Sequence, residues 1–138
     1  MKVMVSACLL GENCKYNGGN NYNQKVLDFV KDKEVIPVCP EVMGGLATPR
    51  VPAEIVGGRV MTKEGKDVDY EFRQGAKLVL ERALEEKPEF VILQSRSPSC
   101  GIKQIYDGSF TGKRIDGQGV TAKLLEEQGF QLVDVEDL

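Results

Sequence analysis

Short runs of β-branched and other apolar residues recur along the chain, separated by longer stretches whose apolar residues follow a helical period. The short runs predict strands at residues 2–6, 35–38, 90–93 and 131–135. The helical period predicts helices at residues 23–33, 67–86 and 117–128. Strands that alternate with helices are typical of βαβ units. We therefore expect an α/β fold, in which a four-stranded, mainly parallel, doubly wound sheet carries helices on both faces.

The predicted helices contain local signals for their ends and their buried sides. Asn23 is a favourable N-cap for the first helix, and Gly129 is a typical stop for the last one. The long middle helix gathers its apolar residues on one side, at Phe72, Ala76, Val79, Leu80, Ala83 and Leu84. Its other side is rich in charged residues, so we expect that side to face solvent.

The connections between these elements carry weaker signals. Residues 53–56 and 59–62 flank a Gly-Gly pair, which predicts a small β-hairpin inserted in the fold. Residues 40–52 are rich in glycine and proline and predict an irregular loop. Residues 105–110 predict a turn or a short extended segment, and Asp116 is interpreted as a helix start.

The composition describes an ordinary soluble protein. The chain has 138 residues, of which 41% are hydrophobic and 28% are charged. Because no repeat or linker interrupts the pattern, residues 1–138 are expected to form a single domain. The net charge of −3 gives no general attraction to nucleic acid. No apolar run reaches membrane-spanning length and no signal peptide begins the chain, so we expect no membrane partner and a cytoplasmic location.

The chain has four cysteines and no histidine. In the cytoplasm such cysteines are expected to be free thiols or metal ligands rather than disulfides. The lack of histidine removes the commonest general base and the commonest zinc ligand. Three cysteines, Cys8, Cys39 and Cys100, come directly after predicted strands. Because the carboxyl ends of parallel strands meet at one edge of a sheet, we expect these three thiols to converge.

Two interpretations of these cysteines are weighed against each other. A free cysteine is usually a small buried hydrophobic residue. All three, however, lie in loops rich in glycine, proline and serine, which favours metal binding for the group. The absence of a Cys-x-x-Cys pair disfavours a zinc ribbon or a thioredoxin-type redox pair, and clustered thiolates suit an iron–sulfur cluster or zinc. With three protein ligands, a [4Fe-4S] cluster keeps one iron open as a Lewis acid. Cys14 is left open as a fourth ligand, a nearby thiol or a structural residue.

Polar residues beside these cysteines are candidates for the chemistry. Glu41 lies two residues after Cys39 and is interpreted as a general acid or base, although a solvated loop glutamate is the common alternative. Ser97 and Ser99 precede Cys100, and their hydroxyls are expected either to act on substrate or to satisfy the loop backbone. Of the two serines, Ser97 is favoured for catalysis, and Ser99 is assigned to substrate binding.

Cationic and aromatic residues are candidates for substrate binding. Arg50, Arg96 and Lys103 could hold an anion such as a nucleotide phosphate, or could be ordinary surface cations. Tyr16 and Tyr106 could stack on a base, or pack in the core or at its rim. The glycines match no dinucleotide-binding or P-loop fingerprint.

Three motifs in this chain resemble those of a bacterial family that was long catalogued as a domain of unknown function. The first is SACLLG at residues 6–11 with CKY at 14–16. The second is PVCPE at residues 37–41, followed by GGL at 44–46, PR at 49–50 and AE at 53–54. The third is SPSCG at residues 97–101, followed by IYDG at 105–108 and Phe110. The characterised members of this family are thiouracil desulfurases. The resemblance spans nearly the whole chain, although Lys15 stands where arginine is common and Gln94 where lysine is common.

The resemblance implies a [4Fe-4S] enzyme that removes sulfur from thiouracil or thiouridine monophosphate without net redox change. It implies Cys8, Cys39 and Cys100 as cluster ligands and Glu41 and Ser97 as the catalytic pair. The expected partner is therefore a small thiolated pyrimidine and not a nucleic acid polymer. Two alternatives stay open, a zinc protein that is structural or hydrolytic and a sulfur-carrying binding module without turnover. The oligomeric state is left open.

Overall fold

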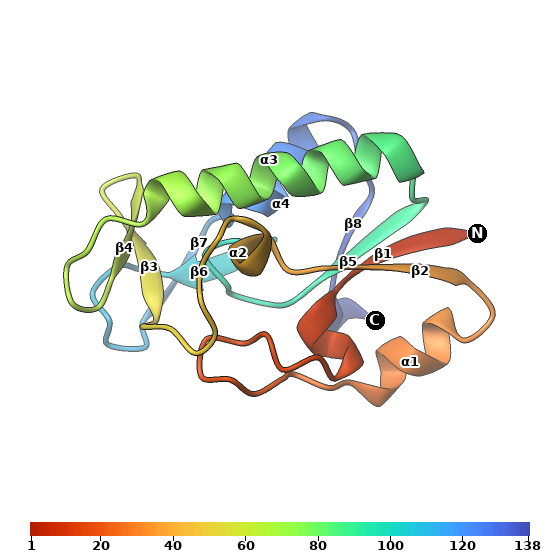
Figure 1. Cartoon of the computed structure of the whole chain (residues 1–138), viewed down its shortest axis with the longest axis horizontal. Helices are drawn as coiled ribbons and strands as arrows, with labels where there is room; N and C mark the ends of the chain where they lie inside the picture. Colours follow the sequence, from red (N-terminus) through yellow and green to blue (C-terminus); the bar gives the residue numbers. More distant parts are fainter.

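The computed structural model describes residues Met1–Leu138, and its centre is a four-stranded sheet (Figure 1). In spatial order the strands are β2 (Glu34–Val38), β1 (Lys2–Ser6), β5 (Phe90–Leu93) and β8 (Leu132–Asp134). All three pairings between neighbouring strands are parallel. The first strand of the chain thus lies inside the sheet, where Met4 pairs with both Ile36 and Val91. The α/β fold predicted from the alternation of strands and helices is confirmed.

Helices cover both faces of this sheet (Figure 1). They are α1 (Gln24–Val30), α3 (Asp69–Glu86) and α4 (Val120–Glu127). Successive residues of a strand point to opposite faces. Val3 and Val5 therefore pack with α1 residues on one face, while Met4 packs with residues of α3 and α4 on the other. All three side chains are fully buried, so β1 is apolar on both sides, as expected for a strand inside a parallel sheet.

The predicted helix signals hold at most positions. The side chain of Asn23 accepts hydrogen bonds from the backbone N–H groups of Lys25 and Val26, and thus caps α1. Gly129 follows α4 with a φ of +87°, a conformation that glycine adopts without strain. The prediction for Leu84 was wrong, because this residue is 52% exposed near the end of α3. Ala83, the residue before it, is fully buried in the core under α3, so the buried side of the helix runs through Ala83 and Leu84 lies on the side that faces solvent.

Two antiparallel hairpins accompany the sheet. The predicted hairpin is confirmed as β3 (Ala53–Val56) and β4 (Arg59–Thr62). The second hairpin, β6 (Gln104–Tyr106) and β7 (Arg114–Asp116), was predicted only as a short extended segment. Asp116 consequently ends a strand, and its interpretation as a helix start was wrong. The strand β7 is exposed throughout, so it lacks the apolar alternation that reveals a half-buried strand.

Short helical turns begin right after two of the sheet strands. The turn η1 (Ala7–Leu10) follows β1, and the helix α2 (Pro40–Met43) follows β2. Residues 40–52 were predicted to be irregular, which was wrong for α2. Proline at the first helical position is favourable because its missing N–H would have no partner there. A further short turn, η2 (Val135–Asp137), lies near the end of the chain. None of the helices is long and apolar enough to span a membrane.

Candidate functional site

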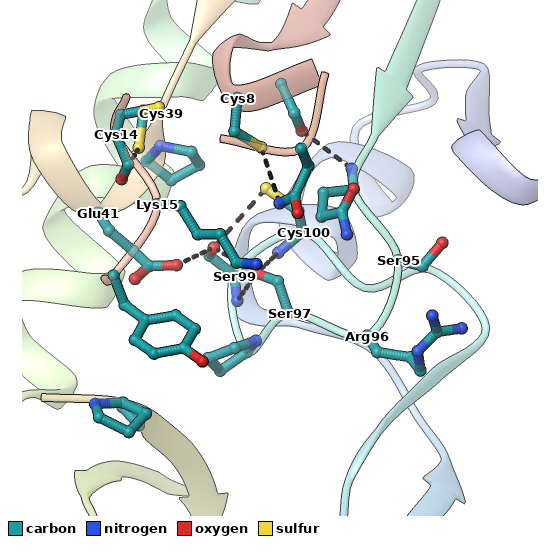
Figure 2. A pocket seen from close by; sticks show the side chains of 18 of the residues that line it. Cys8, Cys14, Lys15, Cys39, Glu41, Ser95, Arg96, Ser97, Ser99 and Cys100 are labelled. Atoms are coloured by element: carbon teal, nitrogen blue, oxygen red, sulfur yellow. Dashed lines mark hydrogen bonds between the residues drawn. The ribbon is translucent and has the colours of Figure 1, made fainter. Parts of the chain in front are cut away.

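A cavity of about 470 Å³ lies at the carboxyl ends of β1, β2 and β5 (Figure 2). All four cysteines line this cavity. Cys8 comes from η1 after β1, Cys39 lies between β2 and α2, and Cys100 ends the loop after β5. The sheet topology therefore brings together the three thiols that were predicted to converge. Cys14 reaches the same cavity from the glycine- and asparagine-rich loop after η1.

The thiols lie in different electrostatic surroundings. Cys100 is only 4% exposed, and burial raises its pKa to about 12 even though Ser6 and Ser99 hydrogen-bond to the sulfur. Burial also raises the pKa of Cys8, whose sulfur accepts a 3.5 Å hydrogen bond from Nδ2 of Asn21. The Cys39 thiol donates to the carbonyl oxygen of Cys14 at 3.9 Å, and the interaction of the two neighbouring thiols lowers the pKa of Cys39 to about 7 and raises that of Cys14.

A chain of hydroxyl groups connects the loop before Cys100 to Glu41 (Figure 2). The Oγ of Ser99 donates to Oε2 of Glu41 at 2.9 Å and lies 2.8 Å from the Oγ of Ser97. The Oγ of Ser97 also accepts hydrogen bonds from the backbone N–H groups of Ser99 and Cys100 at 3.0 and 2.9 Å. When Ser99 donates its single hydroxyl proton to Glu41 and not to the Cys100 sulfur at 3.6 Å, Ser97 is the donor between the two hydroxyls. A proton can thus pass along Ser97, Ser99 and Glu41 in single hydrogen-bond steps.

Arg50 holds the other oxygen of Glu41. Its Nε donates to Oε1 of Glu41 at 3.1 Å, and the two side chains are only 10% and 17% exposed. Its Nη2 donates to the carbonyl oxygen of Cys14 at 2.8 Å, and its Nη1 donates to Ala47 and Thr48. The guanidinium group is therefore engaged within the protein on every side. It fixes the Glu41 carboxylate against the loop that carries Cys14.

Close backbone packing sets the position of Glu41. Glu41 lies in α2, which rests directly on α3 through two glycines. A Cβ added to Gly75 would lie 1.8 Å from the carbonyl oxygen of Pro40, and one added to Gly44 would lie 2.0 Å from that of Glu71. Such distances are impossible for a side-chain carbon, so only glycine allows this approach. Gly75 is the one glycine inside the long helix, an isolated breaker that sequence reasoning could have singled out.

The remaining predicted binding residues are placed differently. Arg96 lines the cavity, but its Nη1 binds both carboxylate oxygens of Glu136 at 2.8 and 2.9 Å, away from the thiols (Figure 2). Lys103 pairs with Asp137 and is not among the residues that line the cavity. Tyr16 and Tyr106, which were considered for base stacking, both line it. Substrate binding by Arg50 and Arg96 stays a prediction, and both side chains are already paired with carboxylates.

Some cavity residues were not identified as functional candidates from the sequence. They include Asn21, Glu54, Lys63 and Phe110. Glu54 accepts hydrogen bonds from the backbone N–H groups of Gly108 and Phe110, 54 and 56 positions away along the chain. No local spacing reveals a contact of this kind. The motif resemblance included Glu54 and Phe110 and was the one available signal.

The donor set of the cavity fits an iron–sulfur cluster. Thiolates are the ligands that these clusters take, and the cavity presents thiols from three strand ends. No three His, Cys, Asp or Glu side chains lie close enough together to share a single metal ion. The thiolates of a [4Fe-4S] cluster bind different irons, so they lie farther apart than the ligands of a single metal ion. A bound metal also keeps a thiol deprotonated, which would offset the high pKa of Cys100.

The chain is similar to proteins of one family over nearly its whole length. The family model described as 2-thiouracil desulfurase matches residues 3–137. A protein of Bacillus subtilis (strain 168), named uncharacterized protein YbbK, is 40% identical over 146 residues, which cover 99% of this chain and 97% of the relative. A solved structure named [4Fe-4S]-dependent thiouracil desulfidase TudS matches with a TM-score of 0.93 and 42% identity. That match covers 99% of this chain and 92% of the other.

Proposed function

The chain belongs to the 2-thiouracil desulfurase family, and we propose that it is itself a [4Fe-4S]-dependent thiouracil desulfurase. The reaction exchanges sulfur for oxygen at the thiocarbonyl carbon. A thiouracil and water give uracil and hydrogen sulfide, so the atoms balance and no electron donor or acceptor is needed. The observation that carries the proposal is the meeting of thiols from three strand ends with a hydrogen-bonded glutamate in one cavity.

We propose that Cys8, Cys39 and Cys100 hold the cluster. These three follow sheet strands, whereas Cys14 comes from a loop and its carbonyl oxygen accepts a hydrogen bond from the Cys39 thiol. When bound with three protein ligands, the cluster supplies an iron that is open to the thiocarbonyl sulfur as a Lewis acid. The similar solved structure favours this centre over zinc, because that protein is named a [4Fe-4S]-dependent thiouracil desulfidase.

Glu41 is placed to move protons during the exchange. Attack by water releases a proton, and the departing sulfur or the ring nitrogen must gain one. The Glu41 carboxylate can take the first proton and exchange it through Ser99 with Ser97. Ser97 is half-buried and borders the cavity, whereas Ser99 is only 1% exposed. We therefore assign the contact with substrate to Ser97 and the relay between Ser97 and Glu41 to Ser99.

Arg50 acts on this chemistry through Glu41. Because its donors are directed to Glu41 and to carbonyl or hydroxyl oxygens of two loops, Arg50 orients the carboxylate and is unsuited to bind a substrate anion. Correct orientation of a reacting group contributes much to the reaction rate, because a small misplacement lowers that rate strongly. Arg50 is accordingly a positioning residue.

The substrate we propose is a thiolated pyrimidine base or its monophosphate. The ring and its thiocarbonyl group define the class, and a phosphate would need a cation at the cavity. Arg50 and Arg96 both pair with carboxylates, whereas Lys15 and Lys63 line the cavity and make no salt bridge. These two lysines would hold the phosphate of a nucleotide. The four free thiols are consistent with a reducing compartment such as the cytoplasm.

Anaerobic reconstitution tests the proposed function. The protein loaded with iron and sulfide is expected to convert 2-thiouracil to uracil and to release one sulfide per uracil, as measured by chromatography and a sulfide assay. 2-Thiouridine monophosphate is tested in parallel, and Lys63→Gln should raise its KM without changing that for the base. A zinc protein would stay colourless and inactive, and a sulfur-carrying module would bind thiouracil without forming uracil. Either of those results would overturn the proposal.

A further inference from the structure

The rim of the cavity carries aromatic side chains that the proposed proton chemistry does not use. They are Tyr16, Tyr106 and Phe110. Tyr16 is 41% exposed, and Phe110 is half-buried. Phe110 belongs to none of the three hydrophobic core clusters and is not packed against any of them. Its ring therefore contributes to none of the hydrophobic cores of the protein, although it is half-buried at the cavity.

The backbone of Phe110 has an unfavourable conformation. Its φ of +59° lies in the left-handed region, where bulky residues are rare. Non-glycine residues keep such conformations only where the surroundings hold them, and these positions cluster at sites that clamp ligands. A phenylalanine side chain offers no polar group, so hydrogen bonding cannot be the purpose of holding it there. The strained backbone therefore holds an aromatic ring at a fixed place on the rim.

Glu54 is the residue that holds this conformation. Its Oε1 accepts hydrogen bonds from the N–H groups of Gly108 at 2.9 Å and of Phe110 at 3.2 Å. Hydrogen bonds to an ionised carboxylate are stronger than those between neutral groups. Gly108 also rests against β3, where an added Cβ would lie 2.6 Å from the carbonyl oxygen of Ile55. The β6–β7 loop is thus docked on the first hairpin in one arrangement, which places Phe110 at the cavity.

We infer that Phe110 stacks on the pyrimidine ring of the substrate and that Glu54 positions Phe110 for this contact. The inference rests on the proposed function, since it names the residue that recognises the ring of a thiolated pyrimidine. Every pyrimidine has a π-face that aromatic side chains bind. The proposed ligand thiols and the serine hydroxyls act instead on the sulfur and the protons of the substrate. Phe110 is therefore a substrate-binding residue, not a catalytic one.

A pair of substitutions at Phe110 isolates the ring. Leucine is also apolar and must adopt the same left-handed backbone conformation, but it has no aromatic face. Tyrosine keeps that face. In cluster-loaded protein, Phe110→Leu should raise the KM for 2-thiouracil and the Kd for uracil about tenfold, and Phe110→Tyr should leave both within about twofold. The turnover number should stay within about twofold for both variants. Glu54→Gln should raise KM and Kd by a smaller factor, because the amide oxygen is a weaker acceptor than the carboxylate.

The outcomes separate this inference from the proposed function. Equal Kd values for uracil in Phe110→Leu and wild type would overturn the stacking role. A lower turnover number with unchanged KM and Kd would also overturn it, since the ring would then only shield the cavity from water. Failure of wild type to convert thiouracil would refute the proposed function alone, because the Kd for uracil, measured by calorimetry, still decides whether Phe110 stacks on a pyrimidine. No uracil binding by wild type would refute the stacking role.

Discussion

The inner wall and the rim of the cavity are built on different principles. The inner wall, defined here as Cys8, Cys39, Glu41, Ser99 and Cys100, follows directly from the carboxyl ends of sheet strands. Within it Ser99 is 1% exposed and Cys100 is 4% exposed. The rim, defined above by its aromatic side chains, belongs to loops and a small hairpin. Tyr16 on the rim is 41% exposed.

This difference means that the inner wall holds the reacting groups in fixed positions, whereas the rim binds the substrate and needs less exact geometry. The inner wall inherits its geometry from parallel strands whose pairing buries both faces, and each polar group in it has a named hydrogen-bond partner. Chemistry that depends on distances of a few tenths of an ångström needs such support. The rim needs only to present apolar and aromatic surface to a flat ring. Damage to the inner wall should therefore abolish the reaction, whereas damage to the rim should weaken substrate binding.

The largest effect is expected from the cluster ligands. Cys100→Ala removes a proposed thiolate ligand from the inner wall, and Cys14→Ala removes a thiol that lines the same cavity from a loop. After anaerobic reconstitution, Cys100→Ala should contain at least about tenfold less iron and sulfide and show no turnover. Cys14→Ala should keep its iron content and visible absorption. Equal loss of iron in both variants would mean that Cys14 is a ligand, and the proposed set of three would be wrong.

Glu41 should give the next largest effect, without loss of the cluster. Glu41→Gln keeps the shape of the side chain but removes its ability to take a proton. We expect the turnover number to fall by about a hundredfold to ten-thousandfold, the range that general acid–base groups contribute. Iron content and visible absorption should match those of wild type. Turnover equal to that of wild type would remove Glu41 from the mechanism.

A matched control separates the charge of Arg50 from its geometry. Arg50→Lys keeps the positive charge beside Glu41 but loses the planar group that reaches Glu41 and the Cys14 carbonyl together. Its turnover number should fall less than that of Glu41→Gln, by about tenfold, with an unchanged KM. Wild-type turnover in Arg50→Lys would show that charge alone suffices. A raised KM instead would restore the prediction that Arg50 binds substrate.

The inner wall was largely predictable from the sequence because it follows from the sheet. Once the strands before Cys8, Cys39 and Cys100 were identified, parallel pairing alone brought their carboxyl ends together. The short distance along the chain from Cys39 to Glu41 then placed the carboxylate near the thiols. The local signals for α1 and the first hairpin succeeded for the same reason, since each depends on a few adjacent residues.

The rim and the support of Glu41 were not predictable, because they depend on contacts between distant segments. The Glu54 carboxylate meets backbone groups more than fifty residues away, and the strand β7 has no buried side to reveal it. Arg50 was predicted to bind an anion, and the charge pattern does not reveal that its guanidinium already holds Glu41. An isolated glycine inside a predicted helix indicates a special role for Gly75, but the sequence does not show that α2 is the element that lies on it.

The smallest effect is expected at the surface ion pair between Arg96 and Glu136. This pair connects the loop after β5 to η2, and the Arg96 guanidinium holds the pKa of Glu136 below its ordinary value of 4.5. A carboxyl whose pKa is lowered by folding stabilises the protein above its unfolded pKa, and this contribution is lost as the pH falls through the folded value. Glu136→Gln should therefore lower the Tm slightly and by a constant amount from pH 8 to about 5, and the difference should narrow below about 4.5.

The same variant tests whether Arg96 takes part in recognition. Glu136→Gln leaves Arg96 without its carboxylate partner, so a substrate-binding arginine would become freer and the KM for thiouridine monophosphate would change. We expect that KM and the turnover number stay within about twofold of wild type, because the guanidinium points away from the thiols (Figure 2). Thermal unfolding at equal cluster loading, together with steady-state kinetics, measures both effects. A shifted KM with unchanged Tm would show that Arg96 binds substrate and that its ion pair with Glu136 does not stabilise the fold.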